Sequence, residues 1–269
     1  MTVFVQQGYT TPIGQYGLKH ARILHAGNYL TVTDTDALPD TSDPYIPAPI
    51  YDTTYERWSI SGASGSWTAT TASGDCDTVC IAGHNFHTIT TVFTVAVRVA
   101  GVWVDVLTDA TVTDGSPIMV IFNAGGKVTG YRVSVTGSGS AFAVCRAGYA
   151  MSMPQMIYGG VAPTKGNRNI TRTVNNSETG VFLGATVMRT SMSCQYQWQH
   201  IKTNWIEANW YSFMRAADTN AFFVAWRPDQ YKASRNDVDY VLSASFDAPA
   251  KMGVGALMTC GFSGEVYSW

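Results

Sequence analysis

Apolar and polar residues alternate with a period of two along most of this chain, the pattern of half-buried β-strands. The alternation is clearest at residues 92–99 and 102–107, and Ala100-Gly101 between these runs predicts a hairpin. The continuous apolar run 117–122 predicts a central strand. Further strands are predicted at 21–25, 58–60, 66–70, 79–82, 131–136, 141–145, 148–151, 184–192, 221–226, 238–242 and 258–266. Strands about every ten residues, separated by Gly, Ser and Asp, predict a sandwich or jelly roll.

One segment has helical spacing instead. Its apolar residues recur three to four positions apart, which predicts a helix over about 199–217. These residues are Ile201, Trp205, Ile206, Trp210, Phe213 and Met214.

Two irregular stretches divide the chain. Prolines 39, 44, 47 and 49 lie within residues 34–49, and proline fixes φ and removes a ladder donor, so a loop or extended arm is expected. Such an arm can lie on a neighbouring subunit or pack on its own domain. The second irregular stretch begins at residue 154. We therefore predict an N-terminal segment with a Pro-rich arm at 1–54, a β-sandwich at 55–153, a linker at 154–176, and a smaller β domain with one helix at 177–269.

Composition narrows the function classes. Hydrophobic residues make up 46% of the chain and charged residues 13%, about half the usual charged share. The formal net charge is -2, so the chain lacks the excess of basic residues typical of nucleic-acid-binding proteins. The chain has no apolar run of about 20 residues, so we predict no membrane span. Residues 1–14 lack a charged segment followed by an apolar one, so we expect no secretory signal and synthesis in a cytosol.

Sequence motifs for catalysis are missing. The chain has no G-x-S-x-G element, Walker loop or dinucleotide fingerprint. Its carboxylates are scattered, and although two that are distant in sequence can meet in a fold, nothing selects a glycosidase pair. We therefore predict no enzyme activity, no catalytic residue and no cofactor.

The five cysteines offer at most a weak metal motif. They are Cys76, Cys80, Cys145, Cys194 and Cys260. Cys76 and Cys80 form a C-x3-C pair followed by His84, and a zinc site would need a fourth ligand, such as His87 or a remote cysteine. Small buried hydrophobic residues on strands are the favoured interpretation, so no metal site is predicted.

The turn Gly83-His84-Asn85 is the candidate contact site. It ends the apolar run 79–82 with two side chains that form hydrogen bonds. At a loop edge, His84 and Asn85 would contact a sugar hydroxyl or a partner's backbone. The favoured alternative is that both side chains satisfy nearby backbone groups, because Asn and His tolerate left-handed turns.

An ordered series of short motifs resembles the minor tail and distal-tail (baseplate hub) proteins of long-tailed bacteriophages. The series spans about residues 57 to 245 and leaves the first 50 or so outside it. Its motifs are Cys80-Ile81-Ala82-Gly83-His84-Asn85-Phe86, Ser116-Pro117-Ile118-Met119, Tyr131-Arg132-Val133, Met153-Pro154, Ile157-Tyr158-Gly159-Gly160, Pro163-Thr164, Ser177-Glu178-Thr179-Gly180, Phe182-Leu183-Gly184 and Phe223-Val224-Ala225-Trp226-Arg227-Pro228.

This resemblance implies a mainly β fold, with a jelly-roll sandwich of the galactose-binding type followed by a β-barrel-like module with one helix. It implies a structural protein of the virion tail, made in the bacterial host cytoplasm. Copies would form a hexameric or trimeric ring at the tail tip or baseplate and attach tube, hub and fibre proteins. The alternative function is a carbohydrate-binding module that adheres to host-surface glycans.

Overall fold

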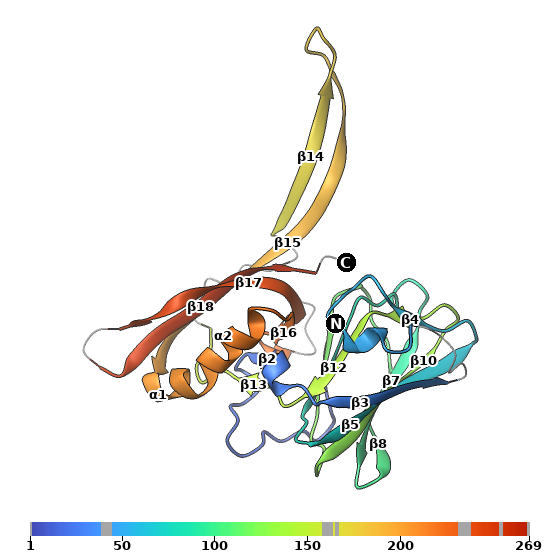
Figure 1. The fold of residues 1–269 in the computed structure, drawn as a ribbon, viewed down its shortest axis with the longest axis vertical. Coiled ribbons are helices and arrows are strands. Elements are labelled where there is room, and N and C mark those ends of the chain that lie inside the picture. Colours follow the sequence, from blue (N-terminus) through green and yellow to red (C-terminus); the bar gives the residue numbers. More distant parts are fainter. Residues whose placement is uncertain are drawn as a thin grey trace.

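The structure is a computed structural model that describes residues 2–38, 45–157, 164, 167–230, 238–252 and 255–267. It is built mainly of β-strands, with a two-sheet sandwich beside a third large sheet that carries the helical segment (Figure 1). The expected mainly β fold class is confirmed. Short 3-10 helices lie at Ala26–Asn28, Ala48–Ile50 and Pro228–Gln230.

The sandwich consists of a four-stranded and a five-stranded sheet. The first has the order β1 (Val3–Val5), β9 (Ile118–Ile121), β6 (Thr78–Ala82) and β12 (Val144–Gly148). The second has the order β3 (Val32–Leu38), β5 (Ser64–Gly74), β10 (Val128–Thr136), β7 (Val92–Val99) and β8 (Val102–Ala110). A small pair, β4 (Trp58–Ser59) and β11 (Ala141–Phe142), lies beside them. Trp67, Phe93 and Tyr131 pack between the sheets against Val79 and Ile118.

The third sheet has seven strands and is open. Its order is β13 (Met151–Ser152), β2 (Arg22–Leu24), β16 (Phe222–Ala225), β17 (Val238–Lys251), β18 (Leu257–Val266), β15 (Phe182–Lys202) and β14 (Arg168–Asn176). The module expected to be barrel-like therefore takes the form of a curved sheet with β13 and β14 at its ends (Figure 1).

The helical segment packs on this third sheet. It comprises α1 (Thr203–Trp205), a π-helical turn (Ile206–Trp210) and α2 (Tyr211–Ala217). It starts later than predicted because β15 continues to Lys202, and Ile201 pairs with Met258 of β18. Trp210 and Phe213 are fully buried in the core under the helix. Within the described residues, no helix is long and apolar enough to cross a membrane.

The four-stranded sheet is buried on both faces, so the two modules share a core. Along β6, Val79 belongs to the sandwich core, whereas the next residue, Cys80, belongs to a second core. That second core also contains Phe223 and Tyr240 of the seven-stranded sheet. Strands covered on both faces are continuously apolar rather than alternating. This explains the run 117–122, whose prediction as a central strand is confirmed by β9.

Residues 1–54 were expected as a separate segment, but their strands belong to all three main sheets. β1 runs parallel to β9, β2 pairs with β13 and β16, and β3 pairs with β5. Pro39 and Pro44 of the expected arm lie outside the described residues. The described end of the arm packs on its own sandwich, where Ile46 is buried and its carbonyl accepts a 2.7 Å hydrogen bond from Trp67 Nε1.

The expected linker 154–176 also contains regular structure. Its last nine residues form β14, which pairs with the outer half of β15. Thr164 is buried, and its hydroxyl donates to Asp239 Oδ2 over 2.7 Å. The motif residues Tyr158-Gly159-Gly160 and Pro163 lie outside the described residues.

Candidate functional site

The turn that follows β6 holds His84 inside the protein. Gly83 has φ +67°, and a Cβ there would come within 2.7 Å of the Ala143 methyl, so the turn requires glycine. His84 is 5% exposed, stacks on Phe86, and bonds through Nε2 to the Ser116 carbonyl over 2.9 Å. Burial lowers the pKa of His84 to about 4. The ring is therefore neutral at pH 7, and its Nε2–H donates to Ser116.

Asn85 ties the same turn to β11. Its Nδ2 donates to the Gly139 carbonyl over 2.8 Å, and the Ala141 N–H donates to its Oδ1 over 2.9 Å. Both candidate residues thus have backbone partners, as the favoured interpretation requires. A ligand contact at His84 and Asn85 stays a prediction, and Asn85 is the more exposed of the two.

The cysteines lie in the cores. All five are free thiols and buried. Cys76 packs in the sandwich core and Cys80 in the shared core, so the C-x3-C pair is divided between two clusters. Burial raises the pKa of Cys76 to about 12. Within the part of the chain that the structure describes, no three His, Cys, Asp or Glu side chains are grouped to hold a metal ion.

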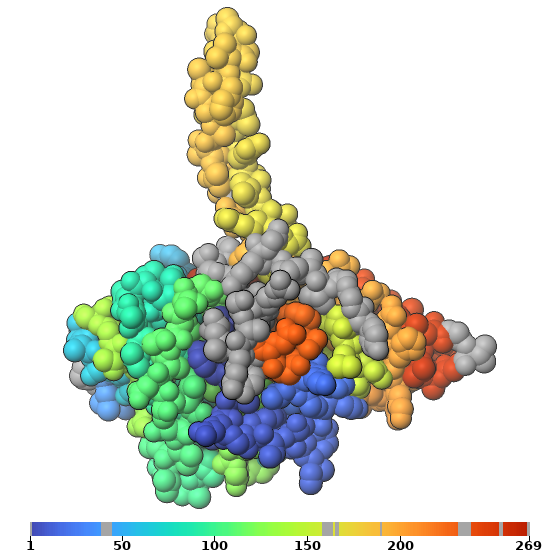
Figure 2. Space-filling view, turned by 180° about the vertical axis from the view of Figure 1, so that it is seen from behind, coloured from blue at the N-terminus to red at the C-terminus, as the bar shows by residue number. Residues whose placement is uncertain are grey.

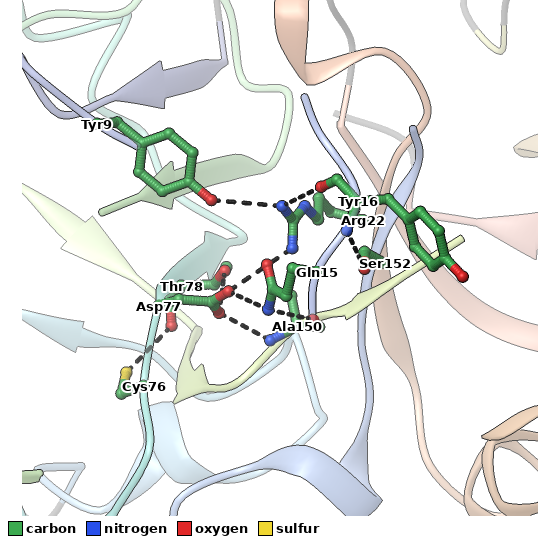
Figure 3. A network of polar contacts seen from close by, with 9 residues as sticks. All are labelled: Tyr9, Gln15, Tyr16, Arg22, Cys76, Asp77, Thr78, Ala150 and Ser152. Carbon is green, nitrogen blue, oxygen red and sulfur yellow. Dashed lines mark hydrogen bonds and ion pairs between the residues drawn. The ribbon is translucent and has the colours of Figure 1, made fainter. Parts of the chain in front are cut away.

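A buried polar network joins the sandwich to the third sheet (Figure 3). Arg22 of β2 is fully buried and lies 3.7 Å from the carboxylate of Asp77, which directly precedes β6. Arg22 Nη2 also donates to the Tyr16 carbonyl over 2.8 Å. The Asp77 carboxylate accepts from Gln15 Nε2 at 2.6 Å, from Thr78 Oγ1 at 2.9 Å and from the Ala150 N–H at 2.8 Å.

The network fixes segments that are distant in sequence. Burial raises the pKa of Asp77, and the Ala150 N–H and the Arg22 guanidinium offset part of that shift. Gln15 bonds to both Asp77 and the Ala150 carbonyl, at 2.6 and 3.2 Å. Tyr16 N–H donates to Ser152 Oγ over 3.1 Å. These bonds hold residues 14–16 against residues 149–152.

A cavity of about 260 Å³ lies beside this network, between those two segments and the helical segment. Neither the sequence motifs nor the spacing of polar residues predicted it. Its lining residues are Gly14, Gln15, Tyr16, His25, Asn28, Tyr149, Ala150, Met151, Ser152, Trp205, Ala208, Asn209 and Ser212. The lining includes both polar groups and aromatic rings, and none of its residues is Asp, Glu, Lys or Arg.

The second prominent feature is an arm, defined as β14, residues 177–181 and the outer half of β15. Figure 2 shows it as a column that stands clear of the rest of the molecule. All nine residues of β14 are exposed. Among the described strands, β14 pairs only with β15, and this part of β15 pairs only with β14. Large apolar side chains along the arm are 48–68% exposed, namely Ile170, Val174, Val181, Phe182, Leu183, Val187 and Met188.

No family model and no curated protein matches the chain. Among solved structures it is similar to a pectin-binding carbohydrate-binding module, at 17% identity over 46% of this chain and 96% of that chain, with a TM-score of 0.38. A chitosan-binding module from Paenibacillus sp. IK-5 matches at 14% identity over 45% and 97%, with a TM-score of 0.38. A Ruminococcus gnavus fucosidase solved with fucose matches at 14% over 39% and 22%, with a TM-score of 0.32. Likenesses this weak carry neither a ligand nor an activity to this chain.

Proposed function

We propose that this protein is a structural subunit of a larger protein assembly, in which the arm of each copy lies against a neighbouring protein. The exposure of the arm carries this proposal. A two-stranded hairpin alone in water is marginally stable, and unpaired strand edges template contacts with other chains. The arm has two such edges, and its large apolar side chains are about half exposed or more.

The free energy available to such a contact is substantial. Fully burying one Val, Leu, Ile, Phe or Met side chain contributes about 1.5–3 kcal/mol. Phe182, Leu183 and Met188 are each 63–68% exposed, so a partner that covers these three would recover most of that contribution from each. The surface of the arm suits an obligate neighbour better than solvent.

The motifs that resemble phage tail proteins support a tail as the assembly. Residues 177–180 and 182–184, two motifs of that series, form the tip of the arm. We therefore propose a virion protein made in the host cytoplasm. It would form a hexameric or trimeric ring at the tail tip or baseplate, next to tube, hub or fibre proteins.

Removal of the arm tests the proposal. In the deletion variant, Asn-Gly replaces residues 173–186 and closes a short hairpin. We expect the wild-type chain to associate in light scattering at high concentration, or to be recovered in tail particles, and the variant to be lost from both. The control variant, Val102→Ser, removes an exposed apolar side chain (65%) from the sandwich edge strand β8. Unchanged association of the deletion variant would contradict the proposal.

A second candidate function is glycan binding by the sandwich. The observation in its favour is that Tyr51 and Tyr55, on the segment before β4, are 51% and 93% exposed. Exposed aromatic rings offer an apolar face with a polar tip, which suits sugar rings. A fold alone does not fix a function, and we assign no catalytic residue. A glycan array probed with wild type and with Tyr55→Ala tests this function. Equal binding by the two proteins would show that Tyr55 does not contact the glycan.

A further inference from the structure

The cavity at the junction of the two modules has a distinctive chemistry. His25 is 3% exposed and lines it. The Gly27 N–H donates to His25 Nδ1 over 3.2 Å, so the proton of the neutral ring lies on Nε2. Within the described residues, the bond from Gly27 is the one hydrogen bond of the His25 side chain, so Nε2–H remains available. The cavity wall thus carries a fixed donor, on an otherwise buried ring, that the hydrogen bonds of the described residues leave unused.

Two amides and a hydroxyl add further hydrogen-bonding groups. Asn209 Nδ2 donates to the Trp205 carbonyl over 3.1 Å, which fixes the amide and leaves Oδ1 to accept. The side chains of Asn28 and Ser212 make no hydrogen bonds to other described residues. Donors and acceptors therefore converge on one small volume from the 3-10 helix and from the helical segment.

Aromatic rings supply the rest of the wall. Trp205, Tyr149 and Tyr16 line the cavity and are partly exposed. Trp205 ends α1, Asn209 lies in the π-helical turn, and Ser212 lies in the first turn of α2. In the π-helical turn, the Tyr211 N–H bonds back to the Ile206 carbonyl. Such π turns occur often at functional sites. Here the turn lies where the helical segment meets the cavity.

We propose that this cavity binds one uncharged sugar residue or a polyol of similar size, stacked on Trp205 and hydrogen-bonded to His25, Asn28 and Asn209. A charged ligand would be buried without a counter-ion. A purely apolar ligand would leave these polar groups unpaired. The volume of about 260 Å³ is below the range of about 300–1,000 Å³ for drug-sized ligands and suits a single ring. This function is additional to assembly through the arm, and it uses other residues than the sandwich tyrosines.

The test is a titration of the full chain with D-glucose, D-galactose, D-mannose, L-rhamnose, N-acetylglucosamine and N-acetylgalactosamine. Saturation-transfer NMR and tryptophan fluorescence report binding, and we expect at least one sugar to bind with a Kd on the order of 1 mM. D-glucuronate and D-glucosamine, which carry a charge, should bind at least tenfold more weakly than the matching neutral sugars.

Two variants locate the site. Trp205→Ala removes the stacking ring. Ser212→Trp fills the cavity from an exposed position, so it still tests the site if Trp205→Ala does not fold. Each should weaken binding at least tenfold. Tyr211→Ala is the matched control, because Tyr211 is 38% exposed on the same segment and does not line the cavity.

Three results would overturn the proposal: no sugar in the panel binds, Ser212→Trp binds as wild type does, or the charged sugars bind as tightly as the neutral ones. Loss of binding in Tyr55→Ala with Ser212→Trp unaffected would place the sugar on the sandwich instead. The arm deletion should leave sugar binding unchanged. The sugar titration therefore tests the cavity, and the association assay tests the assembly proposal independently.

Discussion

The ion pair of Arg22 and Asp77 joins the two modules, and its removal should destabilise the whole chain. Arg22→Met keeps the apolar stem but leaves the Asp77 carboxylate buried with its three hydrogen bonds and no cation. Asp77→Asn keeps the shape but leaves a buried guanidinium whose remaining partners are Tyr9 and the Tyr16 carbonyl. In both variants one buried charge loses its counter-charge.

The size of the effect follows from burial. The two side chains are 0% and 3% exposed, and breaking such a pair costs about 3–5 kcal/mol, because the remaining charge stays desolvated. Typical unfolding free energies are about 5–15 kcal/mol, so each single variant should lose a large part of the stability. The double variant has neither charge, so it should lose less than the sum of the singles by about 1–3 kcal/mol.

The pH dependence gives a second readout. Burial already raises the pKa of Asp77, and removal of the Arg22 cation should raise it further. A carboxyl whose pKa is higher in the folded state than in the unfolded state, where it is about 3.9, binds its proton more tightly when folded. Its contribution to the free energy of unfolding is therefore largest at low pH and is lost as pH rises and the group ionises. The stability deficit of Arg22→Met should therefore be smaller near pH 4.5 than at pH 7.

Urea unfolding followed by tryptophan fluorescence and by far-UV circular dichroism measures all four proteins. Because the modules share a core, we expect one transition that both probes report together. Additivity of the two substitutions within about 0.5 kcal/mol, or single losses below about 1 kcal/mol, would refute the account of the pair. Two separate transitions in the wild type would refute the shared core.

Three further predictions concern other parts of the chain. The free energy of unfolding should fall as pH drops from about 6.5 to about 4, because His84 takes up a proton in the unfolded state but stays neutral when buried. His84→Gln should reduce the slope of unfolding free energy against pH by about 1.4 kcal/mol per pH unit. An unchanged slope in urea titrations would contradict this prediction. Gly148→Ala should cost at least about 2 kcal/mol, because its Cβ would overlap the Asn28 carbonyl, whereas Gly17→Ala, with open space around it, should stay within about 0.5 kcal/mol by thermal melting. Deletion of residues 173–186 should leave the melting temperature within about 2 °C, as no core residue is removed, and a larger drop by calorimetry would show that the arm supports the core.

The sequence pattern predicted most strands because their burial is regular. β7 and β8 alternate and join through Ala100 and Gly101, both at positive φ, as the hairpin signal requires. β14 was missed because a strand exposed at all nine residues has no buried side to produce a pattern. β1, of three residues, pairs with β9 from more than a hundred positions away, and no local signal identifies such a partner.

The candidate sites divide in the same way. The turn at His84 and Asn85 was predicted in the right place because the break in the apolar run is local. The direction of its side chains depends on Ser116 and Gly139, which only the fold brings near. The cavity combines residues 14–16, His25 and Asn28, residues 149–152 and residues 205–212. Their polar and aromatic side chains form one site only because the fold brings these four segments together.

The position of β2 governs when the chain can fold during synthesis. Leu24 leaves the ribosome long before its neighbour in the sheet, Phe223. At about 5–20 residues per second, those roughly 200 intervening residues take about 10–40 s to translate. Until residues 151–152 of β13 are made, β2 has no native partner strand at all, and its second partner, β16, follows only about 70 residues later. Long-range pairing of this kind is slow. The seven-stranded sheet can therefore be completed around β2 only after most of the chain has been made.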